Sequence, residues 1–598
     1  MSARTVPRAS SERRYHRPMR RWPALVLALL CGAAAAQSPT PATPRFGERV
    51  EVDVVNVDVL VTDRDGRPVT DLGRADFELR IDGVPVPIEY FAAPEAEVAP
   101  PAGPLLAPIA PAGPGSTPAP PPAAPPPPEA GHLFVFVDQS ALEWKASDTI
   151  VEEIREFLLA RAGRDDRILV ASFADTLRIL SDAIGDRAAM LAALDEVDRL
   201  RGRGTRVAST RTLLEREVRN FGLSFSVSPE RERAFIEAET QRLKHEIEQY
   251  GREELDRQRR SIAALEQWIG VLAALDGHKS VLLVTAGYTA SPTAFLSAML
   301  QAKRGQVLRS GFDGVDLMEA EGNNMLVRFE AMLRAAQNAR VSFYTITPRT
   351  PPVAQNSAEF GSLGRGVARP APRDLTLIEA ASSVARLAKA TGGASLFLDA
   401  GLSRELERVD RDRAGAYSLG FPVGPEAGDG DHRIEVTVRR PGLEVRHRES
   451  FRRLSLGEQA DQEVAAGATL GAAAASFPVA LELADPEPER GKAHSVGITV
   501  RIPIAGLALL PEGETWVGRL EVRVALRDDQ GSVRVAAPTA IDLRIPDAER
   551  AEALAGNWAH RADLRLASGT HRVAVTVTDL VAGLYSTATA TVVVPAGD

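Results

Sequence analysis

Residues 133–137 read Leu-Phe-Val-Phe-Val, and Asp138 follows them directly. A run that is apolar at every position is typical of a strand buried on both faces of a sheet. Similar runs recur at 168–173, 280–285, 341–346 and 394–398. The segments between these runs have helical periodicity. Strands that alternate with helices predict a sheet covered on both faces, so we expect residues 131–413 to form a doubly wound, mostly parallel α/β domain.

The composition of the whole chain limits the partners that it is expected to bind. Its 598 residues include 71 Lys and Arg and 80 Asp and Glu, which gives a formal net charge of −9. Nucleic acid is bound through a basic face that neutralises phosphates, so an acidic chain predicts no nucleic-acid partner. The hydrophobic fraction of 44% is enough to build several cores. At roughly 150 residues per domain, the length predicts about four domains' worth of chain.

The first 36 residues have the pattern of an export signal. Basic residues precede an apolar run over 22–31, and small residues at 33–36 supply a cleavage site. We therefore expect residues 1–36 to be removed and the mature protein to be periplasmic or secreted. Cys31 is the single cysteine and lies in this segment, which excludes disulfides and cysteine nucleophiles from the mature chain. No later stretch predicts a transmembrane span that would remain after cleavage.

The rest of the chain divides into β units and linkers around the α/β domain. In chain order we predict a linker over 37–47, a β unit over 48–93, a disordered Pro/Ala-rich spacer over 94–130, a β unit over 414–455, an Ala/Gly-rich linker over 456–476 and a β-sandwich over 477–598. The two β units are too short to bury a core separately. We expect them to join into one small sandwich, with the α/β domain inserted between them.

A helical insertion expands the α/β domain over about 206–262. Ser228 and Pro229 form a helix start, and apolar residues recur after them at helical spacing. A continuous helix here would reach roughly 70 Å at 1.5 Å per residue. We expect a helical hairpin that lies against its own domain. A coiled coil through which the protein self-associates is the alternative.

The most informative candidate site follows the strand at 133–137. Asp138 and Ser140 leave this strand on a loop, and Thr205 places another hydroxyl on a later loop. Ligands of open α/β sheets bind outside the carboxyl ends of the strands, and oxygen ligands suit a hard cation. A structural alternative is that the Asp138 carboxylate caps the start of the following helix.

The order and spacing of several motifs resemble the von Willebrand factor type A (VWA) domain, and more narrowly the exported VWFA-related proteins of acidobacteria. The resemblance covers about residues 48–453. It rests on these motifs: Val55-Asn-Val-Asp58, Thr62-Asp-Arg-Asp-Gly66, Phe136-Val-Asp138-Gln-Ser140, Gly277-His-Lys-Ser-Val-Leu-Leu-Val-Thr285, Phe343-Tyr-Thr-Ile-Thr-Pro348, Ala390-Thr-Gly-Gly393 and Tyr417-Ser-Leu-Gly-Phe421.

The resemblance implies a metal-ion-dependent adhesion site, in which Asp-x-Ser-x-Ser, a Thr and an Asp hold Mg²⁺ and leave one position for a ligand carboxylate. Asp138 and Ser140 match its first two positions, and Thr205 matches the Thr. Leu142 stands where the second Ser is expected, and Ala286 stands where the Asp is expected. The predicted metal ligands are therefore Asp138, Ser140 and Thr205 in a degenerate site. The two missing oxygen ligands weigh against Mg²⁺ or Mn²⁺ as a cofactor, because Mg²⁺ demands nearly octahedral oxygen ligands.

These features predict a non-enzymatic, exported binding protein with no catalytic residues. Its partner would be a protein or a cell-surface ligand that contacts the loops around Asp138 and Thr205. The first alternative is an envelope scaffold that binds its partner through the helical insertion, without metal. The second is a cell-envelope hydrolase, although the sequence contains no zinc-protease motif, phosphate-binding loop or serine elbow.

Overall fold

The computed structural model describes residues 53–595 except for gaps at 95–131, 143, 162–166, 181–186, 200–202, 222–228, 276, 309–318, 349–374, 397–400, 424–429, 472–473, 490–492 and 530. The predicted signal peptide with Cys31, the linker over 37–47 and all but the first residue of the spacer over 94–130 lie outside the described residues.

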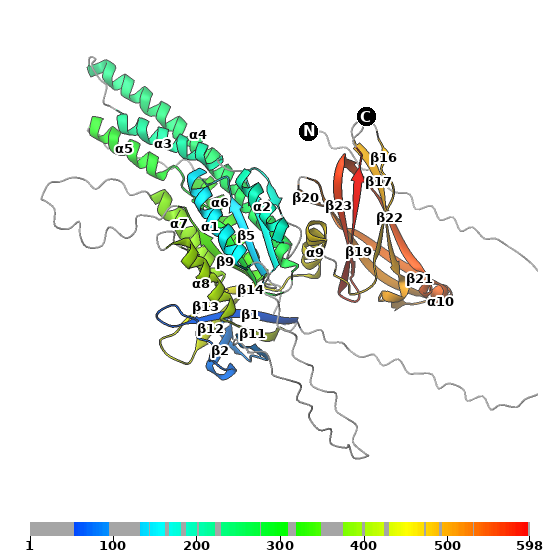
Figure 1. Ribbon diagram of the computed structural model, residues 1–598. Helices are drawn as coiled ribbons and strands as arrows, with labels where there is room; N and C mark the ends of the chain where they lie inside the picture. The colour runs from blue at the N-terminus through cyan, green and yellow to red at the C-terminus, as the bar shows by residue number, and fades with distance from the viewer. Residues whose placement is uncertain are drawn as a thin grey trace, which may run out of the picture. The chain divides into compact units, whose positions relative to one another are not determined.

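A six-stranded sheet forms the centre of the α/β domain, with the strands in the order β10-β9-β8-β5-β6-β7 (Figure 1). Its strands are β5 (His132–Asp138), β6 (Arg167–Phe173), β7 (Leu177–Ile179), β8 (Lys279–Val284), β9 (Val341–Ile346) and β10 (Ala394–Leu396). All pairs are parallel except that of β6 with β7, which is antiparallel. From β5 the chain adds strands first on one side and then, from β8 onward, on the other. The sheet is therefore doubly wound, and its direction of winding reverses between β5 and β8.

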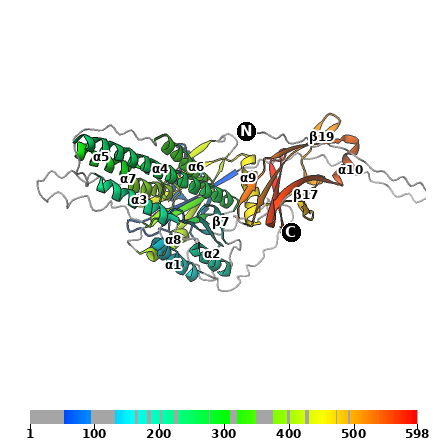
Figure 2. The same cartoon turned by 90° about the horizontal axis from the view of Figure 1, so that it is seen from above.

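Helices cover both faces of this sheet (Figure 2). On one face lie α1 (Trp144–Arg161), α2 (Arg187–Arg199) and α8 (Leu402–Ala414), and on the other lie α4 (Pro229–Ala273), α6 (Glu319–Asn338) and α7 (Leu375–Ala390). Successive side chains of a strand point to opposite faces. Leu133, Val135 and Val137 accordingly pack in the core with α1, whereas Phe134 and Phe136 pack in the core with α4. This double burial explains why the run is apolar at every position.

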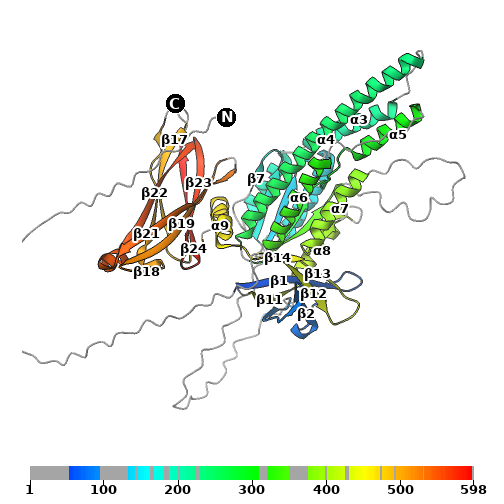
Figure 3. The same ribbon diagram turned by 180° about the vertical axis from the view of Figure 1, so that it is seen from behind.

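The helical insertion packs against helices of its own domain. It comprises α3 (Arg203–Asn220) and the first part of α4, and both helices pack with α5 (Ala294–Leu308) (Figure 3). Leu214 of α3, Leu243 of α4 and Leu296 of α5 meet in one apolar cluster. The 45-residue helix α4 then continues along the sheet. This arrangement agrees with the helical hairpin that the sequence predicted.

The two short β units pair with each other, as their lengths led us to expect. Their strands are β1 (Asp53–Thr62), β2 (Phe77–Ile81), β3 (Val84–Val86), β4 (Tyr90–Ala92), β11 (Ala416–Val423), β12 (Asp431–Val438), β13 (Glu444–His447) and β14 (Ser450–Arg452). They form two four-stranded sheets, in the orders β13-β1-β11-β4 and β14-β12-β2-β3. Each sheet contains strands from both sides of the α/β insertion, so neither unit completes a sheet alone. One apolar cluster lies between the sheets.

A partly buried ion pair joins β1 to the α/β domain. Arg340 Nη2 donates to the two carboxylate oxygens of Asp58 at 3.0 and 3.2 Å, and His278 Nδ1 lies 3.0 Å from Asp58 Oδ2. Burial alone would raise the pKa of the Asp58 carboxyl, but Arg340 and His278 hold this pKa far below its usual range. The carboxylate therefore stays charged at the base of the sheet, away from the carboxyl ends of the strands.

The expectation of a linker over 456–476 was wrong for residues 456–470, which form helix α9 (Leu456–Leu470). Its first turn closes a capping box, because the Ser455 hydroxyl accepts from the Glu458 amide while the Glu458 carboxylate accepts from the Ser455 amide. Gly471, at φ +70°, ends the helix. The Ala/Gly-rich composition predicts a linker, but alanine is the best helix former once a cap is present.

The C-terminal region is strand-rich, and its described strands pair antiparallel. One sheet contains β15 (Ala480–Leu483), β16 (Glu487–Pro488), β17 (Ala493–Pro503) and β22 (Asn557–Ala567). The other contains β18 (Leu510–Glu512), β19 (Thr515–Arg527), β20 (Val533–Val535), β21 (Thr539–Pro546), β23 (Gly569–Asp579) and β24 (Leu584–Val594). The short helix α10 (Arg550–Leu554) precedes β22. Val500 of one sheet and Val522 and Val575 of the other share a core, as in a sandwich.

None of the helices in the described part of the chain is long and apolar enough to cross a membrane.

Tyr417 of β11 provides a test of the small sandwich. Its buried hydroxyl donates to the Val69 carbonyl at 2.8 Å and accepts from the Leu72 amide at 3.0 Å. The substitution Tyr417→Phe removes both hydrogen bonds and leaves a buried amide unpaired, so we expect it to lower the free energy of unfolding by about 1–3 kcal/mol. Thermal unfolding would measure this loss. Tyr90→Phe is the matched control, since Tyr90 is 47% exposed. Equal stability of the two variants would contradict the prediction.

Candidate functional site

The Asp138 carboxylate is completely buried at the carboxyl end of β5. Its Oδ1 accepts from the Ser140 amide at 3.1 Å and from the Ser140 hydroxyl at 2.5 Å. Its Oδ2 accepts from the Ser261 hydroxyl of α4 at 2.7 Å and from the Thr285 hydroxyl, directly after β8, at 3.3 Å. Hydrogen-bond donors from three separate segments therefore converge on this one carboxylate.

A positive charge from α4 lies beside these groups. Arg257 Nη1 donates to the Ser140 hydroxyl at 3.0 Å and lies 3.9 Å from Asp138 Oδ2. The Nε and Nη2 groups of Arg257 donate to the two carboxylate oxygens of Glu254 at 2.9 and 2.5 Å. Burial alone lowers the pKa of Arg257, but the carboxylates of Glu254 and Asp138 more than offset it and raise this pKa above its usual value. The guanidinium is therefore charged although its side chain is only 11% exposed.

The buried side chain of Tyr288 lies next to these groups. Its hydroxyl lies 3.3 Å from the Ser261 hydroxyl, and the side chain is only 1% exposed. Burial and the negative charge of Asp138 both raise the pKa of Tyr288, so the phenol stays neutral. We use the name Asp138 cluster for Asp138, Ser140, Arg257, Ser261 and Thr285.

The structure brings together two of the three predicted metal ligands. Asp138 and Ser140 meet, whereas the Thr205 side chain is exposed in the first turn of α3. Gly204, its neighbour, packs so closely on the 141–142 backbone that an added Cβ would lie 2.3 Å from the Leu142 carbonyl oxygen. Leu142, which takes the place of a serine in the pattern, is buried in the apolar core with α1.

The donor set of the Asp138 cluster does not fit Mg²⁺ or Mn²⁺. Both oxygens of Asp138 already accept hydrogen bonds, and Leu142 and Ala286 contribute no side-chain oxygen. A divalent cation also requires close oxygen ligands, but the guanidinium of Arg257 lies beside them instead. Elsewhere in the described residues, no three His, Cys, Asp or Glu side chains gather as a group that could hold a metal.

Sequence reasoning missed Arg257 and Ser261, although a signal for them existed. They are four residues apart on α4 and therefore lie on one face of the helix. That face also carries Leu265 and Leu272, which pack on the sheet. Polar residues in line with a buried apolar stripe indicate a buried polar partner, and Asp138 is that partner.

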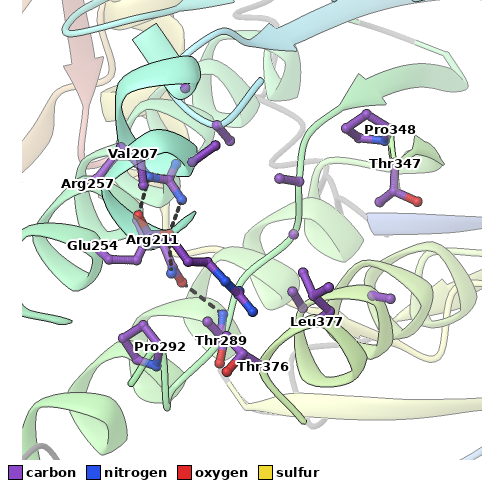
Figure 4. Close-up of a pocket in the computed structure, with 18 of the residues that line it drawn as sticks. Val207, Arg211, Glu254, Arg257, Thr289, Pro292, Thr347, Pro348, Thr376 and Leu377 are labelled. Carbon is purple, nitrogen blue, oxygen red and sulfur yellow. Dashed lines mark hydrogen bonds and ion pairs between the residues drawn. The ribbon is translucent and has the colours of Figure 1, made fainter. Parts of the chain in front are cut away.

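A pocket of about 300 Å³ opens beside the Asp138 cluster, along the carboxyl ends of β5, β8 and β9 (Figure 4). It is lined by Ala141, Gly204, Val207, Ala208, Arg211, Tyr250, Glu254, Arg257, Gln258, Ala286, Gly287, Thr289, Pro292, Thr347, Pro348, Thr376, Leu377, Ala380 and Ala381. Figure 4 shows the long side chain of Arg211 reaching from α3 across the pocket toward Leu377. The pocket therefore has mixed small, apolar and polar walls, with the cationic side chain of Arg211 across it and the Arg257–Glu254 pair at its edge.

Polar contacts from two helices fix the loop that forms one wall of this pocket. The Thr289 amide donates to Gln258 of α4 at 2.8 Å, and the Thr289 hydroxyl donates to Glu379 of α7 at 2.5 Å. Glu379 also accepts from the Ala290 amide at 3.0 Å. The wall after β8 is thus held in place on both sides.

No protein-family model matches this chain, and the comparison with curated proteins finds no match. Among solved structures, the chain is similar to an aerotolerance-related membrane protein from Bacteroides fragilis, at 9% identity over 47% of this chain and 97% of that one, with a TM-score of 0.21. It is also similar to the PilB minor pilin from Streptococcus sanguinis, at 8% identity over 48% of this chain and 62% of that one, with a TM-score of 0.23. Likenesses at these scores indicate neither fold nor function.

Gly287 provides a test of the pocket wall. Its φ is +87°, and an added Cβ would lie 2.2 Å from the Ala380 carbonyl oxygen of α7. We expect Gly287→Ala to lower the free energy of unfolding by at least about 2 kcal/mol, because it combines backbone strain with a steric clash. Chemical denaturation would measure the change.

Gly270→Ala is the matched control for this test. Gly270 lies within α4, and an added Cβ there meets nothing within 4 Å. We expect this variant to gain up to about 1 kcal/mol, since alanine favours a helix over glycine. Equal stability of the two variants would show that the wall is not packed as described.

Proposed function

We propose that this chain is an exported, VWA-like binding protein that takes part of a protein or cell-surface ligand into the pocket at the carboxyl edge of its sheet. The observation that carries the proposal is the position of that pocket. It opens along the ends of β5, β8 and β9, where the winding of the sheet reverses and where open α/β sheets bind their ligands. The doubly wound sheet and the Asp138-Gln-Ser140 loop support the VWA-like interpretation.

The lining of the pocket favours binding over chemistry. Its walls include apolar groups of Val207, Pro292 and Leu377, and the long side chain of Arg211, whose Nε donates to Glu215 at 3.0 Å, adds a positive charge. Small apolar pockets with a few placed polar groups are typical of ligand recognition. No histidine or cysteine is among the described residues that line it, so the pocket presents no histidine base and no thiol nucleophile for hydrolysis.

The proposal predicts that filling the pocket abolishes partner capture. Ala208 lines the pocket from α3 and is half-buried, so Ala208→Trp would occupy the cavity with little effect on the core. The tagged chain would be used to capture a partner from an envelope extract of its own cells, with and without EDTA. We expect the wild type to retain a specific partner in both conditions and Ala208→Trp to lose it about tenfold or more.

Ala559→Trp is the control for this experiment, because Ala559 is an exposed alanine of β22 in the C-terminal region. This variant should capture the partner as well as the wild type does. Undiminished capture by Ala208→Trp would contradict the proposal, and loss of capture in EDTA would contradict its independence of metal.

The scaffold alternative is favoured by two exposed apolar side chains on the insertion. Leu213 of α3 is 53% exposed, and Phe235 of α4 is 55% exposed. If the insertion is the interface, a double variant with Leu213→Asp and Phe235→Asp would lose the partner while Ala208→Trp keeps it. Point variants are preferable to deletion of 206–262, because that deletion also removes the groups that pair with Asp138.

A further inference from the structure

We propose that Arg257 is a built-in cation, whose guanidinium takes the place beside Asp138 and Ser140 that a divalent metal would need. The loops at the carboxyl ends of β5 and β8 then keep their structure without a metal, and adding a metal does not change the stability of the protein. This inference goes beyond the proposed function and holds whether or not the pocket binds a partner.

The guanidinium of Arg257 lies close to the oxygens of both Ser140 and Asp138. Arg257 Nη1 lies 3.0 Å from the Ser140 hydroxyl oxygen and 3.9 Å from Asp138 Oδ2. A metal bound to these two oxygens at the 2.0–2.1 Å that is typical of Mg²⁺ would lie within a few ångströms of the guanidinium. Two positive charges at that separation repel each other strongly where water is scarce. The metal and Arg257 therefore exclude each other.

The surroundings of Arg257 prevent it from moving aside. Its Nε and Nη2 groups are held by both oxygens of Glu254, and Gln258 Nε2 donates to Glu254 at 2.9 Å. The Arg257 side chain is only 11% exposed. Displacing the guanidinium would leave the buried Asp138 without a compensating charge and would also break the pair with Glu254.

The same contacts attach the insertion to the core. Arg257 and Ser261 lie one turn apart on α4, and each bonds to a member of the Asp138 loop. Asp138 is therefore a positioning residue that fixes α4 against the end of β5. The pairing of Arg257 with Asp138 therefore has two consequences. It excludes a metal from this site, and it fixes the position of α4.

The first test measures metal binding by the whole wild-type chain. Manganese would be titrated into protein treated with EDTA, and free Mn²⁺ would be followed by electron paramagnetic resonance. We expect no saturable site that depends on Asp138 and no shift of the melting temperature on adding Mn²⁺ or EDTA. Saturable binding of one Mn²⁺ per chain that is lost in Asp138→Asn would overturn the proposal.

The second test is a double-mutant cycle between Asp138→Asn and Arg257→Met. Arg257→Met leaves the carboxylates of Asp138 and Glu254 without their cation, and Asp138→Asn removes one of the two carboxylates that face Arg257. We therefore expect each single variant to lower the melting temperature, Arg257→Met by several degrees. The double variant should lose clearly less than the sum of the two, because the Asp138 charge that Arg257→Met leaves uncompensated is then absent. The lost pair with Glu254 is common to Arg257→Met and the double variant, so it cancels in the cycle. Purely additive losses would overturn the proposal.

Two further variants keep this test decisive. Arg260→Met is the matched control, because Arg260 is a 56% exposed arginine on the same helix, and it should leave the melting temperature unchanged. If Arg257→Met does not fold, Arg257→Lys replaces it, since lysine keeps the charge but loses the fork that joins Ser140 to Glu254. We expect Arg257→Lys to melt below the wild type, and a melting temperature equal to that of the Arg260→Met control would overturn the proposal.

Discussion

A charged carboxylate without access to water constrains the arrangement around it. Asp138 is completely buried at the end of β5, and burying an isolated carboxylate costs several kcal/mol or more. The structure compensates this charge with four hydrogen-bond donor groups and the guanidinium of Arg257. Because these groups come from the β5 loop, α4 and the end of β8, satisfying one charge fixes the relative positions of all three. The pocket lies beside these three segments, so their relative positions also determine its shape.

Charge compensation is also found where β1 meets the α/β domain. Asp58 of β1 is paired with Arg340 and His278, which lie just before β9 and β8. The Asp58 pair lies near the amino ends of the strands and the Asp138 pair lies at their carboxyl ends. The first joins the small sandwich to the α/β domain, and the second joins the insertion to it. In both cases a carboxylate that is buried or partly buried makes a contact specific, whereas the apolar clusters provide most of the burial.

Much of the fold could be predicted from local patterns. The all-apolar run at 133–137 indicated a strand covered on both faces, and the short β units indicated that they must find partners elsewhere. Helix α9 was missed because composition suggested a linker, while the capping box at Ser455 and Glu458 was the better signal. Of the candidate site, Asp138 and Ser140 were found from their place at a strand end. Arg257 could not be assigned to it, since it lies more than a hundred residues away in an insertion of unknown register.

The sequence by itself determined the main strands of the α/β domain and that Asp138 and Ser140 share one loop, because hydrophobic periodicity and strand ends are local properties of the chain. It also determined that Leu142 and Ala286 contribute no oxygen ligand. Only the tertiary structure decided which charge compensates Asp138, since that depends on the rotation of α4 and its position along the sheet. A long helix can present any of its arginines to a strand end, and the packing of its apolar face selects Arg257.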